Sequence, residues 1–202
     1  MSKLALKPDL ERLAELQLMI GQFSKVRRVI QLADTGRLEN DVEHSFGLAL
    51  TCWFMHAQVA PSLDLQKIMM YALAHDIVEL YAGDTFAFDA QAITTKADRE
   101  AVSLQQVAQE WPDFPDLVDY AQGYADKRDA EAKFVYTIDK LLPSIMVRKS
   151  EDADFWHKHK ITRSAHESEK RNKMKHSPEA IDYLEALNQW LAEPDNFYKP
   201  ND

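Results

Sequence analysis

The side chains best suited to chemistry lie within ten residues, 75–84, with the sequence HDIVELYAGD. An imidazole (His75) stands beside a carboxylate (Asp76), a second carboxylate (Glu79) follows four residues after the histidine, and Gly-Asp closes the run. On a helix, neighbouring residues point about 100° apart, so His75 and Asp76 can close on one ion, and Glu79 shares the face of His75. Groups of these types bind metals and transfer protons, so the run predicts a metal-dependent catalytic site.

Two ligands do not hold a catalytic divalent ion, so other helices must supply more. The candidates are His44 and Asp139, which lies in the apolar run YTIDKLL. A carboxylate in such a run is costly to bury unless something pairs with it, and a metal ion is one such partner. An ordinary ion pair with Lys140 or Arg148 is the alternative. Two imidazoles with two carboxylates suit Mn, Co, Fe, Ni or Zn better than Ca. We expect one divalent ion, one of these five or Mg, with open positions for water and a phosphate oxygen.

Together these motifs carry a family resemblance. Glu-His-Ser at 43–45, His-Asp-x-x-Glu-x-x-x-Gly-Asp at 75–84 and the later Asp139 make the chain resemble the HD-domain phosphohydrolases over about residues 20–150. Within them it looks most like the branch that contains the bacterial 5'-deoxynucleotidases. The four residues that this resemblance makes metal ligands are His44, His75, Asp76 and Asp139.

The resemblance also implies roles for residues around the metal. It implies that Glu79 activates or positions the attacking water, and that Asp84 helps at the catalytic centre or the sugar. A basic residue in the loop before His44 would hold the phosphate, with Arg28 as the first choice and Arg27 as the second. The implied substrate is a small phosphorylated molecule, a nucleoside 5'-monophosphate, and the products would be a nucleoside and phosphate.

Departures from the family patterns narrow the expected substrate and metal count. The 5'-deoxynucleotidases follow the loop arginine with a tryptophan that lies against the nucleotide, whereas Val29 stands here. No histidine occurs between His75 and His157, which favours one metal over two. Glu79 is followed by Leu80, where hydrolases of guanosine pyrophosphate alarmones usually have Glu-Asp. Three alternatives stay open: an alarmone or other nucleotide pyrophosphohydrolase, a non-catalytic nucleotide-binding HD module, and a structural helical protein.

Helices must position these residues, and the spacing of apolar residues predicts them over most of the chain. We expect Asp41 and Asp64 to cap the second and third helices, and Gly83 to end the third. The second helix is apolar nearly all round, which predicts a central position. Its Cys52 and its Trp53-Phe54-Met55 run are expected in the core. The expected helices span about residues 9–22, 42–60, 64–83, 96–110, 115–123, 129–149 and 177–191.

The remaining segments are expected to lie at the surface. Residues 24–42 and 85–95 are predicted loops beside the site, and the charge-rich segment 152–175 is a predicted solvated helix. The fold class is therefore an all-α, HD-domain helical bundle with additional C-terminal helices. The apolar face of the last helix, with Trp190 and Leu191, favours a homodimer. The histidines expected at the surface are His56, His157, His159, His166 and His176.

Length and composition limit the number of domains, the partners and the compartment that we expect. A chain of 202 residues with 46% hydrophobic and 28% charged residues predicts one globular domain, 1–202, with its core at about 20–150 and an extension at about 151–202. A formal net charge of -9 argues against a nucleic-acid partner. No run is long and apolar enough for a membrane span, and the single cysteine allows no intrachain disulfide, so we expect a cytoplasmic protein.

Overall fold

The computed structural model describes residues 10–33, 35–150, 152, 154–192 and 196–200. Over these residues the fold is all-α, as predicted, apart from one two-stranded hairpin. The strands are β1 (Arg27–Gln31) and β2 (Leu38–Asn40). The helices are α1 (Leu10–Phe23), α2 (Asp41–Val59), α3 (Leu65–Ala74), α4 (Glu79–Ala82), α5 (Ala90–Ile93), α6 (Lys96–Glu110), α7 (Pro115–Asp126), α8 (Ala130–Lys149), α9 (Phe155–Lys158), α10 (Arg163–Met174) and α11 (Asp182–Trp190).

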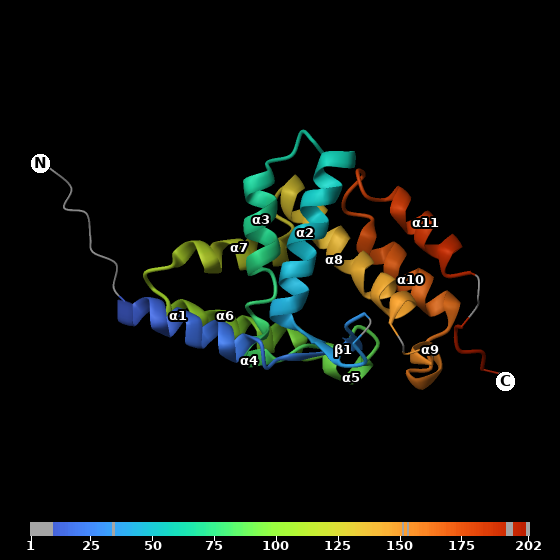
Figure 1. Ribbon diagram of the computed structural model, residues 1–202, viewed down its shortest axis with the longest axis horizontal. Coiled ribbons are helices and arrows are strands. Elements are labelled where there is room, and N and C mark those ends of the chain that lie inside the picture. The colour runs from blue at the N-terminus through green and yellow to red at the C-terminus, as the bar shows by residue number, and fades with distance from the viewer. Residues whose placement is uncertain (1–9, 34, 151, 153, 193–195, 201–202) are drawn as a thin grey trace, which may run out of the picture.

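Helices α2, α3 and α8 pack against one another at the centre of the molecule (Figure 1). Their facing sides bury a core in which Leu48, Ile68, Phe134 and Ile138 have no exposed surface. Helix α7 packs against α3 and α8, and α6 packs against α4, while α10 and α11 cover another side of α8. Each of the three central helices, or the turn that follows it, carries at least one of the predicted metal ligands. The packing of α2, α3 and α8 therefore determines the geometry of the site.

Asn40, and not the predicted Asp41, caps α2. The Asn40 side chain accepts hydrogen bonds from the backbone N–H groups of Val42 and Glu43, and the Glu43 carboxylate accepts one from the Asn40 N–H at 3.2 Å. This reciprocal arrangement is a capping box, which satisfies otherwise unpaired donors at a helix start. Because Asn40 takes that role, the buried Asp41 is left free to face the site.

The helix that carries the opening motif is broken, which corrects the prediction of one helix over 64–83. Asp64 caps α3 as predicted, accepting from the Lys67 N–H, but α3 ends at Ala74. Residues 75–78 form turns, held by bonds such as Glu79 N–H to the Asp76 carbonyl at 2.8 Å, and α4 then begins. These bonds reach back three residues and not four, which tightens the backbone. Gly83, with φ 74°, ends α4 as predicted.

The segment predicted as an irregular loop over 24–42 contains the hairpin. Strands β1 and β2 pair antiparallel, with Arg27 opposite Asn40 and Gln31 opposite Leu38. Successive side chains on a strand point to opposite faces. The hairpin consequently turns Arg28 towards the protein interior and leaves Arg27 exposed. In the second predicted loop, 85–95, the short helix α5 forms.

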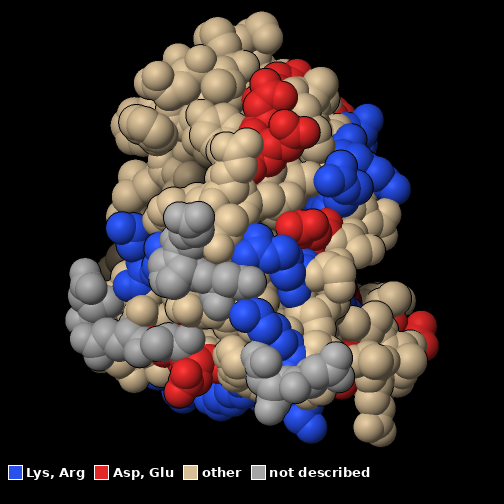
Figure 2. Space-filling model, turned by 90° about the vertical axis from the view of Figure 1, so that its right-hand side faces the viewer, with Lys and Arg blue, Asp and Glu red and all other residues tan. Residues whose placement is uncertain are grey.

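The C-terminal helices pack onto α8, which corrects the prediction of a solvated helix over 152–175. Trp156, His166 and Met174 are buried, and the Lys170 ammonium donates to the Lys140 carbonyl of α8 at 2.7 Å. Charged side chains of both signs lie on the face that this end of the molecule presents (Figure 2). A few large residues therefore bury this segment although many of its side chains are charged.

Two further predictions for the C-terminal region are wrong. His166 is fully buried and is no surface histidine, because α10 turns it towards Ser144 of α8. The last helix begins at Asp182, since residues 178–181 form turns. Leu191 is buried against its own chain and so cannot face a second subunit. His157 is exposed as predicted, and the other three histidines expected at the surface are partly buried.

Helix α2 is one of the three central helices, but it is buried on one side only, which corrects the prediction that Trp53 and Phe54 lie in the core. Cys52 and Met55 lie in the core as expected, but Trp53 and Phe54 are exposed. An all-round apolar pattern predicts that every face is covered, yet α3 and α8 cover only one face of this helix. None of the helices in the described parts of the chain is long and apolar enough to cross a bilayer.

Candidate metal centre

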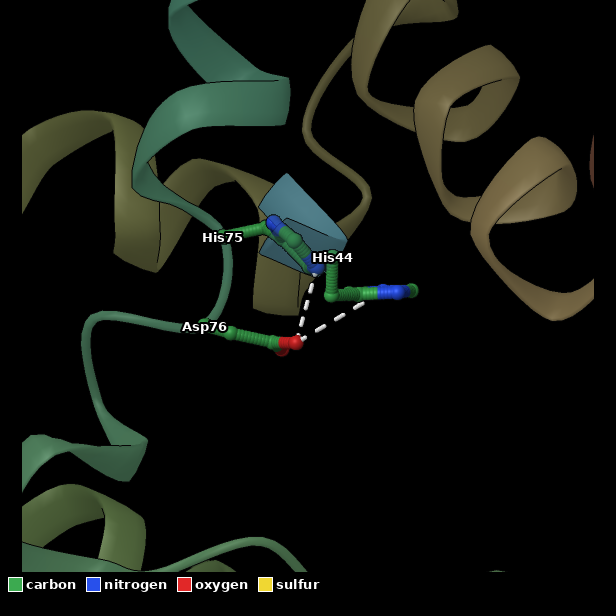
Figure 3. A group of neighbouring side chains, drawn as sticks. All are labelled: His44, His75 and Asp76. Atoms are coloured by element: carbon green, nitrogen blue, oxygen red, sulfur yellow. Dashed lines mark ion pairs between the residues drawn. The ribbon is translucent and has the colours of Figure 1, made fainter. Parts of the chain in front are cut away.

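The structure brings together the four residues predicted as metal ligands. His44 lies in the first turn of α2, His75 and Asp76 lie in the turn that follows α3, and Asp139 lies in the middle of α8. All four side chains are buried. Figure 3 shows the Asp76 carboxylate facing both imidazoles, with an ion pair drawn to His75 and another to His44.

Four donor atoms form a small ring in this cluster. His75 Nε2 is 2.9 Å from Asp76 Oδ2, and His44 Nε2 is 2.9 Å from Asp139 Oδ1. The two remaining neighbours, His44 with Asp76 and His75 with Asp139, are each 3.9 Å apart. Two donors that each lie roughly 2.1 Å from an ion, at right angles, are about 3 Å apart. The two shorter distances match this spacing, and the donors that all lie within 4.8 Å of one another are those of His44, His75 and Asp76.

The contacts of the two imidazoles differ. His75 Nδ1 lies 2.9 Å from the Ala72 carbonyl, which holds the ring proton there and leaves Nε2 with a lone pair for a metal. His44 Nδ1 lies 3.3 Å from the Glu39 carboxylate, and His44 Nε2 faces Asp139. Burial and Arg28 lower the pKa of His44, but its hydrogen bonds to Asp139 and Glu39 raise it to about 9, so a metal bound at Nε2 would displace a proton.

Asp139 uses its two oxygens differently. Oδ1 faces His44, whereas Oδ2 accepts hydrogen bonds from the Tyr124 hydroxyl and the Lys140 ammonium, both at 2.5 Å. Burial alone would raise the pKa of Asp139, but Lys140 and His44 hold that pKa well below its usual value. The predicted ion pair with Lys140 is thus present together with the inward-facing oxygen. It keeps the carboxylate ionised, as a metal ligand must be.

Arg28 lies against this cluster, and Arg27 does not. The Arg28 Nη1 donates to Asp76 Oδ2 at 2.8 Å and to Asp41 Oδ1 at 3.3 Å. Glu79 and Asp84 lie 3.9 Å from the same nitrogen. Burial would lower the pKa of Arg28, but the carboxylates of Asp76, Asp84 and Glu79 raise it well above its usual value. The guanidinium is a permanent cation at the edge of the candidate metal centre.

Glu79 and Asp84 complete the acidic side of the site. Burial raises the pKa of Glu79 well above its usual value, and the charge of Asp76 adds to this effect. The Lys96 ammonium, at the start of α6, lies 3.7 Å from Glu79 Oε1. Burial likewise raises the pKa of Asp84. A buried carboxylate with a raised pKa, next to a site for water, is suited to accept and return a proton.

Sequence reasoning missed four residues that contact this site. Glu39 and Asp41 face His44 and Arg28, and burial raises the pKa of Asp41 to about 7. The sequence signal was available, because both acids lie within the five residues before His44. Tyr124 and Lys96 come from other helices, and only the packing of α6, α7 and α8 brings them near.

Comparison with known proteins places the chain in a family. A family model described as an HD domain matches residues 20–182. A search of curated proteins gave no match. Three solved structures are similar, and since each is less than 25% identical, they show a likeness of fold. A structure described as a predicted metal-dependent phosphohydrolase from Magnetospirillum magnetotacticum MS-1 is 24% identical with a TM-score of 0.78, covering 94% of this chain and 98% of that one.

Two archaeal structures share the fold at lower similarity. A protein from Pyrococcus horikoshii OT3 is 20% identical with a TM-score of 0.61, over 87% of this chain and 98% of that one. A conserved hypothetical protein from Pyrococcus furiosus is 17% identical with a TM-score of 0.58, over 89% and 99%. The family match spans well over half of the chain and includes all four candidate ligands. The chain therefore belongs to the HD-domain family.

Proposed function

We propose that this protein is a metal-dependent phosphohydrolase that cleaves a phosphomonoester, with (deoxy)nucleoside 5'-monophosphates as the substrate class. The observation that carries the proposal is the ring of four buried donor atoms with Glu79 and Arg28 beside it. Family membership supports the metal-dependent hydrolase in general. The 5'-deoxynucleotidase resemblance of residues 75–84 supports the choice of substrate.

In this proposal His44, His75, Asp76 and Asp139 hold one divalent ion. When bound, such an ion polarises a phosphoryl oxygen and lowers the pKa of a bound water. Glu79, whose pKa burial raises, accepts a proton from the attacking water and later returns it to the leaving oxygen.

Arg28 and Asp84 act on the substrate. Arg28 remains a cation in its carboxylate cluster, so it can donate to phosphate oxygens and offset their charge. Asp84 lies on the same side as Arg28 and positions the sugar or the arginine.

Phosphate release from a panel of deoxy and ribo nucleoside monophosphates tests this function, with Mn, Co, Fe, Ni, Zn and Mg each supplied in turn. Turnover of at least one monophosphate is expected. A Glu79→Gln variant should lose turnover while it keeps the metal. If an alarmone or a triphosphate is cleaved and no monophosphate is, the substrate class is wrong. A protein that binds nucleotide equally well before and after this substitution, without turnover in either form, is a sensor.

We also propose that two copies of the chain form a homodimer through α2 and α3. Four large apolar residues on α2 are 47–67% exposed, and Met70 and Leu73 of α3 are 37% and 50% exposed. No Asp, Glu, Lys or Arg occurs between residues 44 and 63. A contiguous apolar face of this kind usually marks an interface. The four residues on α2 are Phe46, Leu50, Trp53 and Phe54.

A second copy is the occupant that we propose for this face, because the face carries no charge that would repel itself. Each chain carries a formal charge of -9, so two copies repel except where they meet on an uncharged surface. A twofold symmetric contact pairs one patch with itself, which an apolar face allows. Light scattering should give a dimer for the wild type, a monomer for Trp53→Glu and a dimer for the control Trp190→Glu on the last helix. A monomeric wild type, or a dimer in Trp53→Glu, would refute this interface.

A further inference from the structure

A group of lysines lies beside the candidate metal centre, and one of them, Lys140, pairs with the candidate ligand Asp139. The Lys127 ammonium stands 4.2 Å from the centre of the Tyr136 ring, and the Lys140 ammonium stands 5.2 Å from the same centre. Tyr136 and Lys140 occupy successive turns of α8, and Lys140 also contacts Asp139. Two cations therefore share one aromatic ring at the border of the site.

The backbone of Lys127 is held in an uncommon conformation. Lys127 follows α7 with φ 52° and ψ 46°, the left-handed region in which glycine is the usual residue. No carboxylate of the described residues lies within ion-pair distance of its ammonium, which donates only to the Ala125 carbonyl at 3.3 Å. Burial lowers the pKa of Lys127, and the charges of Lys140 and Lys173 lower it further. The left-handed conformation caps α7, since the Lys127 N–H donates to the Gly123 and Tyr124 carbonyls, and it holds the ammonium at the end of this helix.

Helix α10 adds further positive charge on this side. Lys173 is one-third exposed and pairs with Glu169 at 2.9 Å, while the buried Lys170 contacts both Glu169 and the Lys140 carbonyl. Four lysines thus gather around two carboxylates, Asp139 and Glu169. Four lysines against two carboxylates leave this side of the site locally positive, which favours the binding of an anion.

We infer that Lys127 and Lys140, with the ring of Tyr136 between them, form a subsite for a second phosphate group of the substrate. The inference rests on the proposed function: Arg28 serves the phosphate that is cleaved, and the lysine subsite holds one that is retained. The substrate class is then a phosphomonoester with a further phosphate, of which a nucleoside 3',5'-bisphosphate is the simplest example. Water adds to the 5' phosphorus, and the bond between this phosphorus and O5' breaks. O5' takes up a proton, so the products are a nucleoside 3'-monophosphate and inorganic phosphate.

Val29 is consistent with recognition by charge. The 5'-deoxynucleotidases that the chain resembles carry at this position a tryptophan that lies against the nucleotide. In this chain the position after Arg28 provides only a small aliphatic side chain, partly buried against the core. Contacts to a second phosphate would replace part of the lost contact to the base.

Two substrates that differ by one phosphate test the subsite. The Mn-loaded full chain is given adenosine 5'-monophosphate or adenosine 3',5'-bisphosphate, and products are separated by chromatography. We expect the wild type to prefer the bisphosphate and to yield adenosine 3'-monophosphate. Lys127→Met should raise the KM for the bisphosphate about tenfold, the effect of one charge-assisted hydrogen bond, and should leave the KM for the monophosphate unchanged. Lys127→Gly, which suits the left-handed backbone, should reproduce this result and so excludes misfolding as its cause.

Lys160 provides a matched control. It is an exposed lysine that also has a left-handed backbone, with φ 53°, and Lys160→Met should change neither KM. Equal KM values for the two substrates in the wild type, or a Lys127→Met effect of the same size on both, would overturn the subsite and leave the proposed function intact.

A calorimetric measurement separates failure of the subsite from failure of the proposed function. If neither nucleotide is hydrolysed with any metal, the proposed function is wrong. Binding of adenosine 3',5'-bisphosphate and of the monophosphate to the wild type, Lys127→Met and Lys160→Met then decides the subsite. The subsite is supported if the wild type and Lys160→Met bind the bisphosphate more tightly than the monophosphate, and Lys127→Met does not. Equal binding of the two nucleotides, or no binding, refutes it.

Discussion

Mild acid should destabilise the fold through His166. This side chain is 1% exposed, its Nε2 lies 2.8 Å from Ser144 Oγ, and it packs against the rings of Trp156 and Phe197. Burial, assisted by the charge of Lys170, lowers the pKa of His166 from 6.5 to about 3. The folded protein therefore keeps the imidazole neutral where the unfolded chain would protonate it.

The size of the effect follows from these two pKa values. Between about pH 3 and 6.5 the unfolded state binds more protons than the folded state, so stability falls as the pH falls through this window and is constant above it. Each pH unit below 6.5 costs about 1.36 kcal/mol. At pH 5 the loss from His166 alone amounts to about 2 kcal/mol, a large part of the stability of an ordinary domain.

Urea unfolding followed by circular dichroism at pH 7.5 and pH 5 measures this loss. The variant His166→Gln keeps an amide that can bond Ser144 but cannot titrate. On going from pH 7.5 to pH 5, this variant should lose about 2 kcal/mol less free energy of unfolding than the wild type loses. His157→Gln removes an exposed histidine and should behave as the wild type. If His166→Gln loses as much stability on acidification as the wild type does, His166 is not held neutral by burial.

Three further predictions test the metal centre and the core. Asp139→Asn keeps the shape of the side chain but removes its charge, so metal affinity should fall at least about tenfold in titrations followed by elemental analysis; unchanged affinity would exclude Asp139 as a ligand. Cys52 has no exposed surface, and burial raises the pKa of its thiol. Ellman's reagent should therefore find no thiol in the native protein and one after unfolding. Rapid labelling of the native protein would contradict the burial of Cys52. Gly123→Ala would place a methyl group 3.0 Å from a ring carbon of Tyr71, and urea unfolding should show a loss of about 1–3 kcal/mol. Gly47→Ala meets no atom within 4 Å and should not destabilise, so equal effects of the two substitutions would refute the packing argument.

Local patterns predicted much of the fold, because the responsible interactions are local. The helix expected at 96–110 is α6 with the same bounds, and the cap at Asp64 and the stop at Gly83 are confirmed. The convergence of His44 with residues 75 and 76 was expected from the family resemblance of these motifs, and no local pattern predicts it.

Other features depended on contacts that no local pattern records. Asn40 and Asp41 are both good caps, and only the position of Arg28 in three dimensions decides which of them takes that role. No glycine or proline marks the end of α3 at Ala74, so the break between α3 and α4 had no sequence signal. Lys170 belongs to a strongly charged segment, and its burial follows from the docking of α10 on α8.

The hairpin and the helical core carry different parts of the candidate site. The four candidate ligands are carried by α2, α3 with its following turn, and α8, which form the core, whereas Arg28 and Val29 lie on a ribbon of only two strands. Such a ribbon contributes little to stability by itself. On the proposed function, a lineage could exchange residues of β1 and acquire a new substrate while it inherits the hydrolytic centre unchanged.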